Sequence, residues 1–333
     1  MNNKIAILEK RLLDFYYKSR YYSIAFAFWD FVWWICFYLR PPLSWKLSTY
    51  AIKQKTAWLD HYIEKRYQTI IQSFEQLSKE TIGVNKGCRR IWVFWGQGED
   101  QMPVLVRACY KQLISLNGDV VLVTKENVHD YVDIPAAIYQ KVESGKLTWA
   151  NFSDIVRTTL LAQHGGLWLD ATVWITRPFP FDDFKTMPFY SVNGKVPVNN
   201  KSVRFWTSFE WNWSSWAMLA NEPGSLLFQF VSQMMLAIAV KELYWLDYVL
   251  QDYLIFYACR KFPQIGKDMT ACIEIEFKNR GKLSSLMNSP YNEDEYKKLN
   301  TTDYIFKLSF RTNWTRSDSQ DRLTYYGHLI NHN

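Results

Sequence analysis

The chain has 333 residues, of which 48% are hydrophobic, so it can bury a substantial core as one large domain or two unequal ones. Its aromatic content of 17%, with 16 tryptophans, is high and suits either membrane-interface belts or stacking platforms for sugars and bases. The five cysteines are scattered without a CxxC or CxxH spacing, which argues against a zinc site or a disulfide framework and favours a reduced, cytoplasmic compartment.

The net charge of +7 belongs to the first quarter of the chain. Residues 1–90 contain 15 lysines and arginines against 7 aspartates and glutamates, a balance of +8. Residues 91–333 contain 24 against 25, a balance of −1. Because most of the chain carries no excess of positive charge, the composition argues against a nucleic-acid binder, and we expect no nucleic-acid partner.

An aromatic segment, "YYSIAFAFWDFVWWICFYL", covers residues 21–39 and predicts a helix. Such a helix is about 28 Å long, roughly the thickness of a bilayer core. However, Asp30 lies at its centre, and ten of its 19 residues are Phe, Trp or Tyr, of which Trp and Tyr prefer the interface. The pattern favours a helix lying in the inner face of the cell membrane, with residues 1–46 as the contact region. The alternative is a helix packed on the rest of the protein.

Residues 44–80 predict one or two amphipathic helices, and residues 81–90 form a turn-rich linker. Beyond this linker, short apolar runs at 91–95 and 119–124 alternate with helical segments such as 103–116. This alternation predicts an α/β fold with a mostly parallel sheet covered on both faces. We therefore expect an N-terminal helical region, residues 1–87, and a catalytic domain, residues 88–333.

Ligands of such sheets bind beyond the carboxyl ends of the strands, where the loop Gly96-Gln97 follows the first strand. In "SDIVRTTLLAQHGG", Ser153 is the expected N-cap of a helix over 154–164. Asp154 and Arg157 lie three residues apart and so share one helix face. They either form a local ion pair or border the ligand cleft, where they hold sugar hydroxyls or phosphate oxygens.

The apolar run "LWLDATVWI", residues 167–175, predicts one strand after the two glycines. Its alternation places Asp170 and Thr172 side by side on one face. A lone buried carboxylate needs a partner, which is either a divalent cation bridging to a diphosphate or a paired arginine.

The order Ser-Asp-x-x-Arg, leucine-rich helix, Gly-Gly, apolar triplet and Asp-x-Asp resembles retaining sugar-nucleotide glycosyltransferases of the DXD group. That group includes yeast-type mannosyltransferases and glucosylating toxins. The longer match looks like its capsular polysaccharide synthesis branch and covers roughly residues 88–310. It runs through "IWVFWGQGEDQMP", "DIPAAIYQKVESGKL", "WLDYVLQDYLI" and "IFKLSF".

The resemblance implies a GT-A fold, in which Trp95, Gly96 and Gln97 contact the nucleotide and Asp154 and Arg157 hold the donor sugar and diphosphate.

It also implies a divalent metal, manganese or magnesium, near Asp170, which matches the first acid of the motif. Thr172 stands where the second acid would be. A hydroxyl is a weaker ligand than a carboxylate for such a cation, so the dependence on metal is left open.

Asp247 and Asp252 lie in a segment that approaches the reacting sugar in enzymes of this type, although solvent-facing acids are an equal alternative. Lys307 matches a lysine that could pair with the leaving diphosphate, or is a strand-edge lysine. His328 and His332 are weak candidates for a C-terminal metal or lid residue.

"WNWSSW", residues 211–216, offers faces for sugar stacking or for core packing. The implied activity is hexosyl transfer, with retention, from a nucleotide-diphosphate sugar such as UDP-hexose to a polyprenyl-linked saccharide. The alternative is a catalytically inactive scaffold of a polysaccharide-synthesis complex.

Overall fold

The computed structural model describes residues 2–36, 38–39, 43–77, 88–192, 213–272 and 280–331. The strands are β1 (Ile91–Phe94), β2 (Val120–Val123), β3 (Gly166–Leu169), β4 (Val173–Ile175), β5 (Phe189–Ser191), β6 (Ala217–Ala220) and β7 (Ile305–Lys307). The first helices are α1 (Asn2–Tyr21), α2 (Ile24–Ile35), α3 (Leu43–Arg66), α4 (Gln68–Leu77), α5 (Val104–Leu116), α6 (Ala136–Glu143) and α7 (Trp149–His164). Later helices are α9 (Leu226–Lys241), α10 (Leu250–Lys261), α11 (Pro263–Cys272), α12 (Lys282–Leu286), α13 (Glu293–Thr302) and α14 (Tyr325–Asn331). Short 3-10 turns cover Glu99–Gln101, Val128–Asp130 and Phe181–Phe184.

The central sheet has the strand order β2-β1-β3-β6-β5. Strands β2 and β3 both pair with β1 in parallel. Strand β6 is antiparallel to both of its neighbours, so β5 runs in the same direction as β3. Four of the five strands therefore share one direction, and the predicted mixed α/β fold with a mostly parallel sheet is confirmed.

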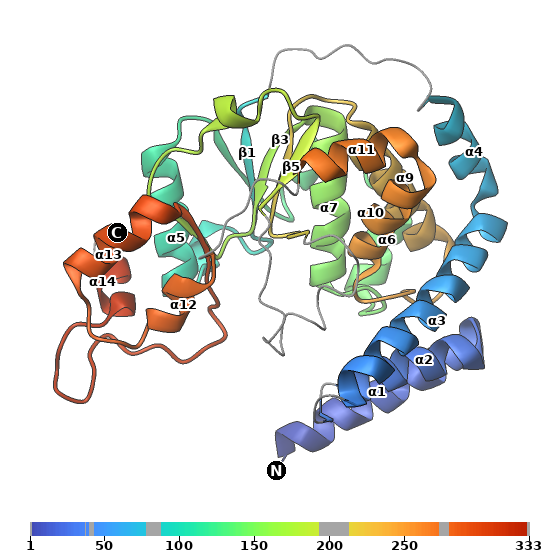
Figure 1. Cartoon of the computed structure of the whole chain (residues 1–333), viewed down its shortest axis with the longest axis horizontal. Helices are drawn as coiled ribbons and strands as arrows, with labels where there is room; N and C mark the ends of the chain where they lie inside the picture. Colours follow the sequence, from blue (N-terminus) through green and yellow to red (C-terminus); the bar gives the residue numbers. More distant parts are fainter. Residues whose placement is uncertain are drawn as a thin grey trace.

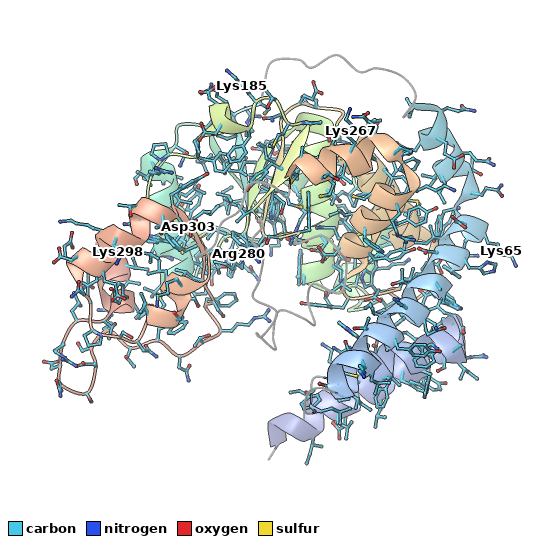
Figure 2. All side chains as sticks on the ribbon, viewed as in Figure 1. Lys65, Lys185, Lys267, Arg280, Lys298 and Asp303 are labelled. Carbon is cyan, nitrogen blue, oxygen red and sulfur yellow. The ribbon has the colours of Figure 1, made fainter. Side chains whose placement is uncertain are left out.

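Helices cover both faces of this sheet (Figure 1). Helices α7, α9, α10 and α11 pack against one another on one side, and α5 lies with the C-terminal helices on the other. Apolar side chains fill the space between these layers, whereas lysines such as Lys65 and Lys298 project from outer helix faces (Figure 2). The burial of the apolar faces on both sides of the sheet stabilises this three-layer arrangement.

The turn between α7 and β3 requires its two glycines. Gly165 and Gly166 have φ angles of 66° and 91°, which side chains rarely adopt. A Cβ on Gly166 would lie 2.5 Å from the carbonyl oxygen of Arg90. Because of this close approach, β3 can pair with β1 directly after the helix ends.

The predicted single strand over 167–175 is wrong, because the chain turns at Asp170. The amide of Val173 donates to the carbonyl of Asp170 at 2.9 Å and closes this turn. Beyond it, β4 leaves the central sheet and pairs with β7 in antiparallel register, Val173 opposite Lys307. This partner strand comes from far along the chain, so the local alternation of residues could not reveal it.

The predicted helix over 21–39 is also wrong, since α1 ends at Tyr21 and α2 begins at Ile24. Ser23 separates them, and its hydroxyl accepts a hydrogen bond from the amide of Phe26 at 3.3 Å. In the described ranges, no helix is both long and apolar enough to cross a membrane. Two helices, α3 and α4, cover the described part of the segment predicted for residues 44–80, and residues 78–87 lie outside the description.

Buried ion pairs join the N-terminal helices to the rest of the protein. Asp30 on α2 accepts from Lys18 on α1 at 2.6 Å and from Lys55 on α3 at 2.5 Å. Lys55 also contacts Asp247, in the loop before α10, at 2.5 Å. These four side chains are almost fully buried, so the acid in the aromatic segment has two protein cations as partners. The proposed boundary at residue 87 stays a prediction.

We predict that Lys55→Met lowers the free energy of unfolding by about 3–5 kcal/mol, because it leaves buried carboxylates without their shared cation. Lys53→Met is the matched control, since Lys53 lies on the same helix with an exposed side chain. Urea unfolding followed by circular dichroism measures both. Equal stability of the two variants would show that the buried network does not hold the N-terminal helices.

Candidate active site

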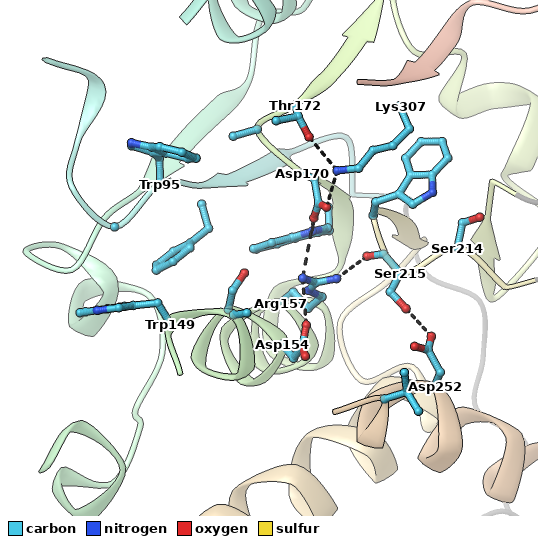
Figure 3. Close-up of a pocket in the computed structure, with 18 of the residues that line it drawn as sticks. Trp95, Trp149, Asp154, Arg157, Asp170, Thr172, Ser214, Ser215, Asp252 and Lys307 are labelled. Carbon is cyan, nitrogen blue, oxygen red and sulfur yellow. Dashed lines mark hydrogen bonds and ion pairs between the residues drawn. The ribbon is translucent and has the colours of Figure 1, made fainter. Parts of the chain in front are cut away.

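A cavity of about 1080 Å³ opens at the carboxyl ends of β1 and β3. The loop after β1, the start of α7, the turn after β3, the residues before β6, the start of α10 and the end of β7 all contribute to its wall (Figure 3). This is the edge at which ligands bind in open α/β sheets. Nine of the ten residues predicted for the site line it, namely Trp95, Gly96, Gln97, Asp154, Arg157, Asp170, Thr172, Asp252 and Lys307.

Helix α7 presents Asp154 and Arg157 to the cavity. The helix begins earlier than predicted, because Thr148 and not Ser153 is its N-cap and accepts from the amide of Asn151 at 3.2 Å. Asp154 and Arg157 therefore both lie inside the helix, where their spacing of three residues places them on one face. Arg157 Nη2 lies 2.9 Å from Asp154 Oδ1, which is the predicted ion pair.

The guanidinium of Arg157 also contacts three other residues of the cavity wall. Its Nη1 donates to the backbone carbonyl of Ser215 at 2.6 Å, and its Nη2 lies 3.7 Å from Asp170 Oδ1. The group stacks over the ring of Trp168, with 5.1 Å between Cζ and the ring centroid. Since Arg157 is held on several sides, its positive charge has a fixed position at the cavity surface.

Asp170 and Thr172 both face Lys307, which the pairing of β7 with β4 brings to the turn. Lys307 Nζ lies 2.7 Å from Asp170 Oδ2 and 2.7 Å from Thr172 Oγ1 (Figure 3). Asp170 Oδ1 accepts from the indole of Trp168 at 3.0 Å. Burial alone would raise the pKa of Asp170, but Lys307 and then Arg157 lower it to about 2, so this carboxylate is ionised.

Two further carboxylates of the cavity have raised pKa values and so hold a proton more readily than a free carboxylate does. Burial, assisted by the negative charges of Asp252 and Asp170, raises the pKa of Asp154 to about 7 against the opposing effect of Arg157. Burial also raises the pKa of Asp252, which accepts a hydrogen bond from the Ser215 hydroxyl. The cavity therefore combines a permanently charged acid with two acids that exchange protons at a higher pH.

Sequence analysis missed Ser215, which links Arg157 to Asp252, and Trp149, in the first turn of α7. Trp149 lies four residues before Ser153, which also lines the cavity, so this helical spacing could have identified it. No local signal pointed to Ser215. Five indole rings line the cavity, which gives it flat apolar faces: Trp95, Trp149, Trp168, Trp213 and Trp216. Of the predicted stacking segment, residues 211–212 lie outside the description.

Asp247 and the two histidines do not join the cavity lining. Asp247 is buried against Lys55, and its Oδ1 accepts from the amide of Val249 at 3.0 Å, so it holds the loop before α10. The prediction that it lies at the site is not met. His328 stacks on Tyr291, 3.7 Å between ring centroids, outside the lining, and His332 falls outside the described residues.

The donor set around Asp170 does not fit the expected divalent cation. Magnesium in such sites is bound by one or two carboxylates together with water and phosphate oxygens, whereas here the single carboxylate, Asp170, and the hydroxyl of Thr172 are already bonded to the ammonium of Lys307. Over the described residues, no three His, Cys, Asp or Glu side chains gather in a way that could hold a metal. The metal stays a prediction of the resemblance.

The cavity combines cations, acids and indole rings at the carboxyl edge of the sheet, where open α/β folds bind their ligands. A family model described as "Capsular polysaccharide synthesis protein" matches residues 43–329. The chain therefore belongs to this family, and the membership indicates a role in capsule biosynthesis. The match begins at α3 and thus includes helices outside the resemblance at 88–310. A search of curated proteins found no match.

We predict that Asp154→Asn becomes more stable relative to the wild type as the pH rises from 4 to 7. The folded protein holds a proton on Asp154 up to about pH 7, whereas the unfolded chain releases it near its ordinary pKa of 3.8. Wild-type stability therefore falls over this window, and the difference becomes constant above it.

Urea unfolding at pH 4, 5, 6, 7 and 8 measures this difference. The groups facing Asp154 are Arg157, Asp170 and Asp252, and none of them is altered by the substitution. A difference that stays constant from pH 4 to pH 7 would contradict the raised pKa.

Proposed function

We propose that the chain is a glycosyltransferase of GT-A fold that transfers a hexose from UDP-hexose to a polyprenyl-linked saccharide during capsule synthesis, with retention of the anomeric configuration. The arrangement of Arg157 and Lys307 around Asp170 carries this proposal. Two cationic side chains meet at the carboxyl edge of the sheet, where a diphosphate accepts charge-assisted hydrogen bonds. Membership of the capsule family supplies the biosynthetic setting.

The size and the lining of the cavity support a nucleotide-sugar as the ligand. The cavity volume, about 1080 Å³, lies at the upper end of the range of small-molecule sites. Trp95 and Gln97, after β1, are suited to the base and ribose, because an indole ring stacks on either. Arg157 and Lys307 then bind the diphosphate, and the hexose lies toward Asp154 and Asp252.

In the proposed reaction, the bond between the anomeric carbon and the diphosphate oxygen breaks and its electrons leave with the diphosphate. The acceptor hydroxyl oxygen bonds to the anomeric carbon on the same face and loses its proton. Arg157 and Lys307 stabilise the negative charge that develops on the diphosphate. Asp252 is suited to receive the proton, because its pKa is raised and its carboxylate is positioned by Ser215.

The N-terminal helices would bring this cavity to the inner face of the membrane. Helix α1 exposes an apolar row at helical spacing, Ile5, Leu8 and Leu12, with 46–52% of each side chain accessible. Helix α2 adds Ile24 and Phe28, which are 72% and 48% exposed. Helices α1 and α2 lie at one end of the molecule, beyond the sheet (Figure 1). Exposed apolar side chains in a basic region favour an anionic lipid surface.

We predict that the purified full chain slowly hydrolyses one or more UDP-hexoses and that Asp170→Asn reduces the rate at least tenfold. The substitution removes the charge that holds Arg157 and Lys307 in place. Release of UDP is measured across a panel of nucleotide-sugars. Asp130→Asn, a surface acid, is the control and should retain the wild-type rate. Absence of nucleotide binding across the panel would favour an inactive scaffold.

We predict that Leu8→Glu combined with Leu12→Glu reduces binding to anionic lipid vesicles at least tenfold, because it places charges on the apolar face of α1. Co-sedimentation with vesicles of phosphatidylglycerol and phosphatidylcholine measures the bound fraction. Ile114→Glu is the control, since Ile114 is similarly exposed, at 42%, but lies on α5. Unchanged recovery of the double variant would contradict the membrane role.

A further inference from the structure

The ammonium of Lys307 occupies the position at which a DXD-type site would hold its cation. It touches the acid of the motif, Asp170, and the residue in the second acid position, Thr172, at 2.7 Å each. These are the two side chains from which metal coordination was expected. A divalent cation bound there would have to displace the ammonium or lie beside it, and the two like charges repel.

The backbone fixes the base of this lysine on both sides. Lys307 pairs with Val173 in the sheet register, and its amide donates to the carbonyl of Arg280 at 2.9 Å. The next amide, of Leu308, donates to the carbonyl of Thr172 at 3.0 Å. These bonds hold β7 against the turn after β3. The pairing of the strands therefore places the Lys307 ammonium within contact distance of Asp170.

The ammonium of Lys307 can also donate a hydrogen bond into the cavity. An ammonium has three N–H donors, and the contacts with Asp170 and Thr172 take two of them. Lys307 lines the cavity, and 32% of its side chain is exposed. Within the described part of the chain, one donor is thus available for an oxygen of a bound ligand.

The positions of the two cations suit a diphosphate ester. Arg157 lies on the opposite side of Asp170, 3.7 Å from Oδ1, while Lys307 contacts Oδ2. Asp170 thereby spaces two positive groups along one wall of the cavity. The diphosphate of a nucleotide-sugar carries two negative charges, and both cations can donate charge-assisted hydrogen bonds to it while they share the one negative charge of Asp170.

We infer that Lys307 takes the place of the divalent cation and, together with Arg157, binds the donor diphosphate, so that the donor binds without metal. This inference rests on the proposed function, because it names how the same cavity binds its nucleotide. The inference also explains why a threonine stands in the second acid position, since a hydroxyl accepts a hydrogen bond from the ammonium without adding a second negative charge to the site.

Calorimetric titration of the full chain with UDP and with uridine, each in EDTA and in manganese, tests this inference. The wild type should bind UDP equally in both buffers. Lys307→Met should weaken UDP binding by about tenfold to hundredfold, the range of a hydrogen bond to a charged group, and leave uridine binding unchanged. Lys307→Arg should restore most of the affinity.

Lys125→Met is the matched control, because Lys125 also lines the cavity but pairs with Glu126 and not with Asp170. It should bind UDP nearly as the wild type does. Manganese paramagnetic resonance supplies a second reading that needs no nucleotide, and the wild type should leave the free manganese signal unchanged.

UDP binding that requires manganese, or manganese binding that Asp170→Asn abolishes, would overturn the inference and leave the proposed function standing. Failure of UDP and all UDP-hexoses to bind in either buffer would instead overturn the proposed function, and the inference with it.

Discussion

The contact between Asp170 and Lys307 is the interaction on which the cavity depends. It joins the turn after β3 to β7, and thus connects the central sheet to a strand near the C-terminus. Arg157 approaches the same carboxylate from α7, so three separate segments meet at one acid. A half-buried carboxylate between two cations keeps both contacts only if its geometry is maintained, which the glycine turn at 165–166 and the β4–β7 pairing both provide.

The N-terminal helices are connected to this cavity through a second buried charge network. Lys55 on α3 contacts Asp247, and Asp247 accepts from the amide of Val249 directly before α10. Helix α10 carries Asp252, whose carboxylate lines the cavity. The helices that expose the apolar face therefore also support one side of the site. This connection is consistent with a family match that begins at residue 43 and not at the central sheet.

The local parts of the fold could be predicted from the sequence. Short apolar runs identified β1 and β2, and the spacing of Asp154 and Arg157 identified their ion pair, because both depend on near neighbours in the chain. Contacts between distant segments could not be predicted. The pairing of β4 with β7 places Lys307 against Asp170, and Asp247 is bound to Lys55 outside the cavity lining. In neither pair does the sequence around one residue indicate the other as its partner.

A crystal structure of the full chain grown with UDP and manganese tests the central claim most directly. The account predicts that the diphosphate lies between the guanidinium of Arg157 and the ammonium of Lys307, with no anomalous manganese peak beside Asp170. The result that would contradict it is a manganese ion coordinated by Asp170 and Thr172 with Lys307 displaced, or a nucleotide bound outside the cavity.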